Sequence, residues 1–148
     1  MKTKKIVKSS LFPANKEEIF LKLQKIETLQ YIAKPFARFI PLDDNQSIKW
    51  KEGAKLSFRL YIFGFIPFGT HKIDVISFDK DSGISTLENN KHIPIWNHQI
   101  YLEPVDEGTT RYSDEVEIGA SCKTPFVALW AKAFYTHRQR KWKRLLRN

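Results

Sequence analysis

Two ionisable residues, His98 and Asp114, lie in neighbouring stretches of the chain that alternate between apolar and polar residues. The face that each of them shares is otherwise apolar: Trp96, Ile100 and Leu102 in the first stretch, and Tyr112, Val116 and Ile118 in the second. A carboxylate that is buried without a partner is costly, and burial raises its pKa. We therefore expect His98 and Asp114 to face the interior and to meet there, directly or through a water molecule.

The two stretches are predicted to form a hairpin around the Pro104–Gly108 turn. Folding it about Glu107 places Asp114 beside Ile100 and diagonal to His98, about 7–8 Å away between backbone positions. Such a pair could polarise a carbonyl or hydroxyl group of a ligand, or move a proton. Three interpretations stay open: a polar pair that fixes the hairpin register, an anchor for a ligand, or a catalytic acid–base pair.

The C-terminal segment contributes two further candidates, His137 and Arg138. His137 lies on the apolar side of the predicted helix, and Arg138 lies at the edge of that side. Either could reach Asp114 from the opposite wall of the interior, and an arginine–carboxylate contact would be the stronger one. In the alternative, Arg138 lies along the surface with only its aliphatic stem buried.

Other chemistry has little support in the sequence. The four histidines, at 71, 92, 98 and 137, form no HExxH motif and no cluster with cysteines, and no glycine-rich phosphate loop is present. We therefore predict no metal and no cofactor. Cys122 is the single cysteine, so no internal disulfide can form, and this favours a reducing, cytoplasmic location. No stretch is apolar enough to span a membrane, and no apolar segment follows the charged N-terminus as in a signal peptide.

These residues need a framework to position them, and the hydrophobic periodicity indicates one. Seven strands are predicted: Lys5–Phe12, Phe39–Leu42, Lys55–Phe63, Thr70–Phe78, Ile84–Glu88, Ile95–Glu103 and Thr109–Gly119. A helix capped by Asn15 and a short helix at Leu29–Ala33 separate the first strand from the others. Because the strands alternate cleanly, they favour one antiparallel sheet with one solvent-exposed face. The 148 residues fit a single domain, 1–148.

After Pro125 the period returns to 3.6 and predicts one long helix. Its apolar arc is wide: Phe126, Val127, Trp130, Phe134, His137, Lys141 and Leu145 on one side, with Tyr135, Trp142 and Leu146 adjoining. A helix of about twenty residues spans about 30 Å, enough to cross the domain. Since a strongly curved sheet and a straight helix leave space between them, we expect an enclosed cavity, which is the default place for a ligand.

The charge is uneven along the chain. The net charge is +9, and residues 123–148 carry eight Lys and Arg residues and no acidic residue. This segment could contact anionic lipid or nucleic acid, or the positive charge could serve solubility alone. Trp142 lies on the wheel beside Tyr135 and Leu146, so we expect it to be packed rather than stacked on a base. Nucleic acid is therefore the less favoured partner, and the oligomeric state stays open.

The predicted hairpin connection Phe63–Gly69 is unusually apolar for a turn. It could cover the mouth of the cavity, touch a membrane or pack on the rest of the domain, and the sequence leaves these alternatives open.

The chain resembles the SRPBCC superfamily, also called START-like, which includes the birch-pollen-allergen group and polyketide cyclase and dehydratase-like proteins. The resemblance lies in a hairpin and the helix that follows it. The first strand of the hairpin carries Trp96 and His98, the second carries Thr110, Asp114 and Val116, and the helix carries Tyr135, His137 and Arg138. The resemblance is greatest to small bacterial ligand-binding domains, whose hairpin reads Trp-x-His-x-His-x-Phe. Ile100 and Leu102 replace the second His and the Phe, which favours a more apolar pocket.

This resemblance implies a helix-grip α+β fold, in which a curved antiparallel sheet of about seven strands surrounds the C-terminal helix in the order β-α-α-β6-α. It also implies binding of a hydrophobic or amphipathic small molecule, lipid-like or polycyclic. The predicted ligand-binding residues are Phe58, Leu60, Trp96, His98, Ile100, Asp114, Val116, Trp130, Phe134 and Arg138. The alternatives are a cyclase or dehydratase-type enzyme that uses His98 and Asp114 as acid and base, and a peripheral protein that places its basic helix on anionic membranes.

Overall fold

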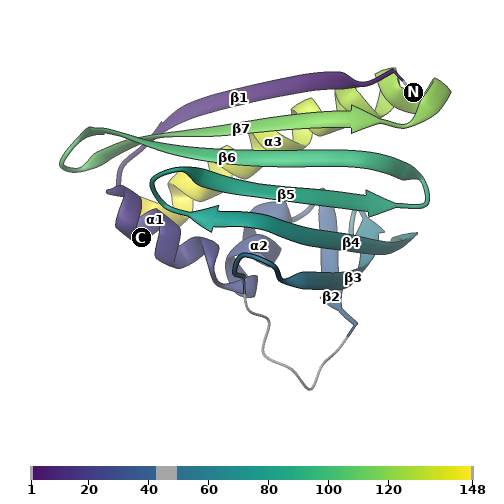
Figure 1. Cartoon of the computed structure of the whole chain (residues 1–148), viewed down its shortest axis with the longest axis horizontal. Coiled ribbons are helices and arrows are strands. Elements are labelled where there is room, and N and C mark those ends of the chain that lie inside the picture. The colour runs from purple at the N-terminus through teal and green to yellow at the C-terminus, as the bar shows by residue number, and fades with distance from the viewer. Residues whose placement is uncertain (1, 43–49, 148) are drawn as a thin grey trace.

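The protein folds as one curved antiparallel sheet closed on one side by helices, and its computed structural model describes residues 2–42 and 50–147. The elements follow in this order: β1 (Lys4–Phe12), α1 (Lys16–Leu23), α2 (Ile26–Ala33), β2 (Ala37–Pro41), β3 (Lys55–Ile62), β4 (Ile66–Asp79), β5 (Gly83–Asn90), β6 (Ile93–Asp106), β7 (Thr109–Gly119), a 3-10 turn (Ser121–Lys123) and α3 (Thr124–Arg147). The predicted order of strands and helices is confirmed, and Figure 1 shows the sheet with α3 behind it.

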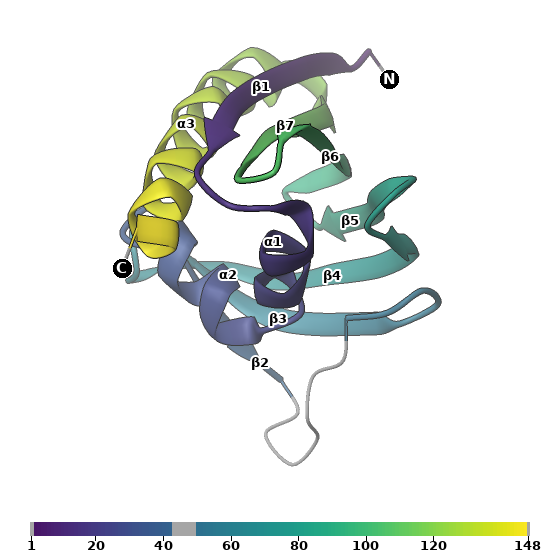
Figure 2. The same ribbon diagram turned by 90° about the vertical axis from the view of Figure 1, so that its left-hand side faces the viewer.

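The seven strands form a single sheet in the order β1-β7-β6-β5-β4-β3-β2. All neighbouring pairs are antiparallel. β1 forms one edge of the sheet and pairs with the last strand, β7, and β2 forms the other edge. Seen from the end, the sheet curls from β1 round to β2, and α2 and α3 lie on its open side (Figure 2). This is the helix-grip arrangement expected from the sequence.

The ends of several elements differ from the predicted ones. The second helix begins at Ile26, one turn before the predicted start at Leu29. β4 begins at Ile66, so the turn after β3 is shorter than the predicted connection Gly64–Gly69. The first helix begins as expected, because the Asn15 side chain accepts a hydrogen bond of 2.9 Å from the backbone N–H of Glu18.

A local hydrogen-bond motif sets the start of α3. The Thr124 hydroxyl accepts a bond from the Ala120 backbone N–H and donates one to the Ser121 carbonyl, both at 2.8 Å. Pro125 follows in the first turn, where its missing N–H leaves no intrahelical bond unmade. β7 therefore passes into α3 through a tightly held connection, and α3 then crosses the concave face of the sheet (Figure 2).

The buried apolar residues form two clusters along α3. The first surrounds the N-terminal half of the helix and includes Phe39, Trp96 and Phe134. The second lies toward the C-terminal end and includes Phe12, Tyr112 and Trp142. Trp142 has no exposed surface, so the prediction that it packs in the interior is confirmed.

Candidate functional site

A cavity of about 520 Å³ lies between the concave face of the sheet and α3. Most of the side chains around it are aliphatic or aromatic, and the polar ones are few: Thr28, His71, Thr86, Glu88, His92, His98, Lys123 and Arg138. Lys123 and Phe126 line the cavity and are also exposed, Phe126 to 76%, so the cavity reaches the surface near the start of α3. The volume is typical of sites that hold a small organic ligand.

The structure brings seven of the ten predicted ligand-binding residues to the cavity wall: Leu60, Trp96, His98, Ile100, Trp130, Phe134 and Arg138. The other three, Phe58, Asp114 and Val116, are at most 1% exposed and lie behind the wall. Phe58 packs against Phe39 and Trp50 instead. The alternation of β3 and β7 places these side chains on the inner face, but neighbouring side chains pack against Phe58 and Asp114.

His98 and Asp114 meet directly. The Nε2 atom of His98 lies 2.7 Å from Oδ1 of Asp114, and both side chains are buried. The observed register pairs Ile100 with Asp114 and His98 with Val116, which is the diagonal relation expected from the sequence.

The other oxygen of Asp114 is bound by α3, through a residue that the sequence analysis did not select. Gln139 donates from Nε2 to Oδ2 of Asp114 at 2.9 Å and to the carbonyl of Lys8 at 2.8 Å. His137, one of the two predicted partners, instead donates to the carbonyl of Lys34. Asp114 thus has both oxygens occupied and connects β7 with β6 and α3.

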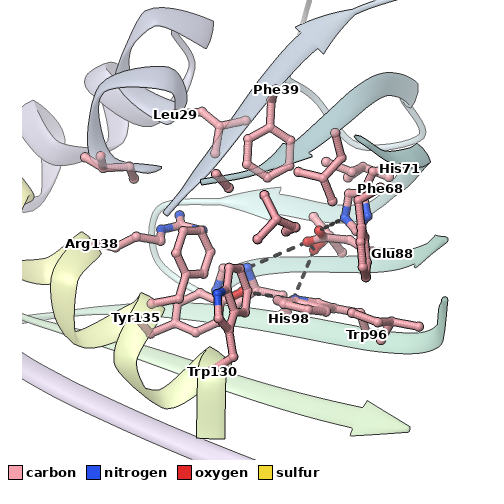
Figure 3. Close-up of a pocket in the computed structure, with 18 of the residues that line it drawn as sticks. Leu29, Phe39, Phe68, His71, Glu88, Trp96, His98, Trp130, Tyr135 and Arg138 are labelled. Atoms are coloured by element: carbon pink, nitrogen blue, oxygen red, sulfur yellow. Dashed lines mark hydrogen bonds and ion pairs between the residues drawn. The ribbon is translucent and has the colours of Figure 1, made fainter. Parts of the chain in front are cut away.

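A second carboxylate, that of Glu88, also escaped the sequence analysis, and its side chain is 11% exposed. It lies on β5 and accepts hydrogen bonds of 2.7 Å from Nε2 of His71 and from the hydroxyl of Thr86. Its Oε2 atom is 3.7 Å from Nδ1 of His98, so the His98 ring lies between two carboxylates. Figure 3 shows Glu88 with His71 and His98 at the cavity wall.

The hydrogen bonds among His71, Glu88, His98 and Asp114 shift the pKa values of two of these side chains. Burial acts against the charged form of His98, but the hydrogen bonds to Asp114 and Glu88 outweigh it and raise the pKa of His98 above 6.5. Burial also acts against the charge of Glu88, yet His71 and His98 together hold its pKa far below 4.5. We infer that the positions of Asp114 and Glu88 on either side of the ring favour the protonated form of His98.

A pH titration of His98 tests this inference. We expect its ring resonances, followed by NMR and assigned with a His98→Gln variant, to titrate with a midpoint above 6.5. Replacing Asp114 by asparagine should lower that midpoint, because one of the two carboxylates is removed. A midpoint at or below 6.5 in the unaltered protein would contradict the ion-pair arrangement.

The same shifts fix the pH range in which the network stabilises the fold. The raised pKa of His98 contributes stability that is complete below pH 6.5 and is lost as the pH rises through its folded-state value. The lowered pKa of Glu88 contributes stability that is complete above pH 4.5 and is lost as the pH falls through its folded-state value. The network is therefore most stabilising between pH 4.5 and 6.5.

Arg138 is buried rather than spread along the surface. It is 7% exposed, lines the cavity, and lies within 5.5 Å of the Phe134 ring centre and 5.1 Å of the Tyr135 ring centre. No carboxylate of residues 2–42 and 50–147 lies within 4 Å of it, so it does not form the predicted contact with Asp114. Figure 3 shows the guanidinium between α3 and the strands.

Metal and membrane signatures are also absent from the part of the chain that the structure describes. No group of three or more His, Cys, Asp or Glu side chains in that part is arranged to hold a metal ion. None of its helices is both long and apolar enough to cross a bilayer.

The curved seven-stranded sheet, the long C-terminal helix and the order of elements define a helix-grip fold, which the chain shares with START superfamily proteins of known structure. The chain belongs to the family described as a domain of unknown function (DUF8410), which matches residues 11–146. A search among proteins of curated function finds no match.

Several solved structures share this fold. A START superfamily protein from Mycobacterium smegmatis is 14% identical, with 97% of each chain covered and a TM-score of 0.75. Zhui aromatase/cyclase from Streptomyces sp. R1128 is 11% identical, with 98% of this chain and 92% of that chain covered and a TM-score of 0.65. Ara h 8.0201 is 10% identical, with 95% and 98% covered and a TM-score of 0.62. At these identities the likeness concerns the fold.

Proposed function

We propose that this protein binds a hydrophobic or amphipathic small molecule in the cavity between the sheet and α3. The observation that carries the proposal is a hollow of about 520 Å³ whose wall is mostly apolar and which reaches the surface beside Phe126. Burying apolar ligand surface there would contribute about 25 cal/mol per Å². The helix-grip fold, shared with a START superfamily protein, supports the same function.

The geometry favours binding over acid–base catalysis. Asp114 does not line the cavity, and both of its oxygens bind protein groups. His98 reaches the cavity, but one ring nitrogen bonds Asp114 and the other faces Glu88. A general base needs a free nitrogen within hydrogen-bond reach of the ligand. The pair is therefore arranged to hold the wall together rather than to exchange a proton with a ligand.

A variant that fills the cavity tests the proposal. Ala37 lines the cavity and is buried, whereas Ala133 of α3 is exposed. We expect the protein to bind the neutral probe N-phenyl-1-naphthylamine saturably, followed by its fluorescence. Ala37→Phe should weaken binding at least about tenfold because the ring occupies ligand space, and Ala133→Phe should leave it unchanged.

Native mass spectrometry of protein purified from cells complements this titration and should show a co-purifying small molecule. Because overpacking costs about 1–3 kcal/mol, a thermal melt must show that Ala37→Phe is folded. Full probe affinity in folded Ala37→Phe, or a protein that neither binds the probe nor carries a co-purified molecule, would contradict the proposal.

A further inference from the structure

Arg138 is a buried cation on the cavity wall, and no residue that the structure describes places an anion beside it. Its side chain is 7% exposed, and its Nε atom is buried with no hydrogen-bond partner in the described part of the chain. Within residues 2–42 and 50–147, no carboxylate lies within 4 Å of the guanidinium. A buried charge is costly unless it is paired. The described residues provide no such partner for Arg138, so a bound ligand is the group that could supply one.

The two carboxylates in the neighbourhood are already engaged. Glu88 is bound by His71 and Thr86, and Asp114 is bound by His98 and Gln139. They act on Arg138 only over a longer distance. Burial acts against its charge, but nearby groups, the carboxylates of Asp114 and Glu88 among them, outweigh burial and raise the pKa of Arg138. The guanidinium therefore stays charged.

Aromatic rings hold this cation in a defined place. The guanidinium carbon lies 5.5 Å from the centre of Phe134 and 5.1 Å from the centre of Tyr135. The planar guanidinium group can bind a carboxylate through two parallel hydrogen bonds. A fixed guanidinium in an apolar hollow is thus preorganised for an anionic group that arrives with a ligand.

We propose that the ligand is an amphipathic monocarboxylate whose carboxylate pairs with Arg138 and whose apolar body lies along α3 toward Phe126. This rests on the proposed function, and it adds the chemical class of the ligand. One guanidinium matches one negative charge, and the nearby Glu88 and Asp114 disfavour a dianion such as a phosphate monoester. Arg138 lies twelve positions after Phe126 on α3, so the two are about 18 Å apart along the helix axis. This distance suits an elongated apolar chain.

The test compares ligands of equal chain length that differ in charge, dodecanoate and dodecanol. Both are measured by displacement of N-phenyl-1-naphthylamine near pH 7, where the free carboxylate is ionised. The unaltered protein should bind dodecanoate at least about tenfold more tightly than dodecanol. Arg138→Gln should weaken dodecanoate binding by about 10- to 100-fold and change dodecanol binding by less than about threefold.

The matched control is Arg140→Gln, since Arg140 lies on the same helix and is exposed. It should leave both affinities unchanged. A second variant, Arg138→Lys, keeps the charge and loses the paired donors, so it should retain part of the preference for dodecanoate. Circular dichroism checks that each variant is folded, and the comparison of the two ligands on the unaltered protein holds even where a variant is not.

The outcomes separate the two proposals. Equal affinity of the unaltered protein for dodecanoate and dodecanol, or equal effects of Arg138→Gln and Arg140→Gln, would overturn the carboxylate inference and leave cavity binding standing. Loss of both ligands with the neutral probe still bound would overturn it as well. A protein that binds none of the three compounds would remove the proposed function itself.

Discussion

Replacing Asp114 by alanine should lower the free energy of unfolding by about 3–5 kcal/mol, measured by urea denaturation below pH 6.5. Asp114 is 1% exposed and bonds the His98 imidazolium at 2.7 Å. Without it, Glu88, 3.7 Å away, is the one carboxylate within 4 Å of the buried ring in the described part of the chain. The loss should be smaller at a pH above the raised pKa of His98, because the neutral ring no longer needs the carboxylate.

Glu103→Ala provides the control for this variant. Glu103 forms an exposed ion pair of 3.8 Å with Arg111 on the same hairpin, and such pairs contribute about 0–1 kcal/mol. A loss below 1 kcal/mol for Asp114→Ala, or a loss that does not shrink as the pH rises, would show that His98 and Asp114 do not form a charged pair.

Replacing Trp142 by alanine should also cost about 3–5 kcal/mol, for a different reason. Trp142 has no exposed surface, and its ring centre lies 5.8 Å from that of Phe12 and 5.7 Å from that of Tyr112. Removal of the indole leaves a hole in the second apolar cluster, where β1, β7 and the last part of α3 meet. Urea denaturation gives the loss directly.

Ligand binding should be nearly unaffected by this change. None of Phe12, Tyr112 and Trp142 lines the cavity, so folded Trp142→Ala should bind the neutral probe within about threefold of the unaltered protein. Leu129→Ala is the control for stability, since Leu129 is 70% exposed and its loss should cost less than about 0.5 kcal/mol. A small loss for Trp142→Ala, or a collapse of probe binding in the folded variant, would contradict the separation of the two clusters.

The contact between His98 and Asp114 could be predicted because strand alternation and hairpin register are both properties of the local sequence. The alternation of polar and apolar residues also marks Glu88 and His71 as residues on an apolar face. Thr86 and Glu88 share a strand face with Ile84, and His71 shares one with Ile73, so each pattern places a polar side chain on an inner face. Reading every polar residue on an apolar face as a candidate would have found both.

The helix was harder to interpret, because a helical wheel shows which residues share a side and not where the sheet touches it. Arg138 was placed at the edge of the apolar arc, whereas the structure buries it with Ala131 and Tyr135. Phe126 lies on the predicted arc and is nevertheless 76% exposed, because the mouth of the cavity lies there. The distance between wall and helix depends on the curvature of the whole sheet, which no local pattern contains.

The pairing of β1 with β7 joins residues near opposite ends of the chain, such as Ile6 and Val116, and α3 follows all seven strands. Synthesis on the ribosome therefore completes the β-layer before the segment that covers it. Contacts of such long sequence separation also form slowly. α3 docks onto the sheet through the hydrogen bonds of Gln139 to Lys8 and Asp114. Before it does so, we expect the nascent protein to expose the apolar concave surface of the sheet. Exposed apolar surface of this kind is what chaperones bind.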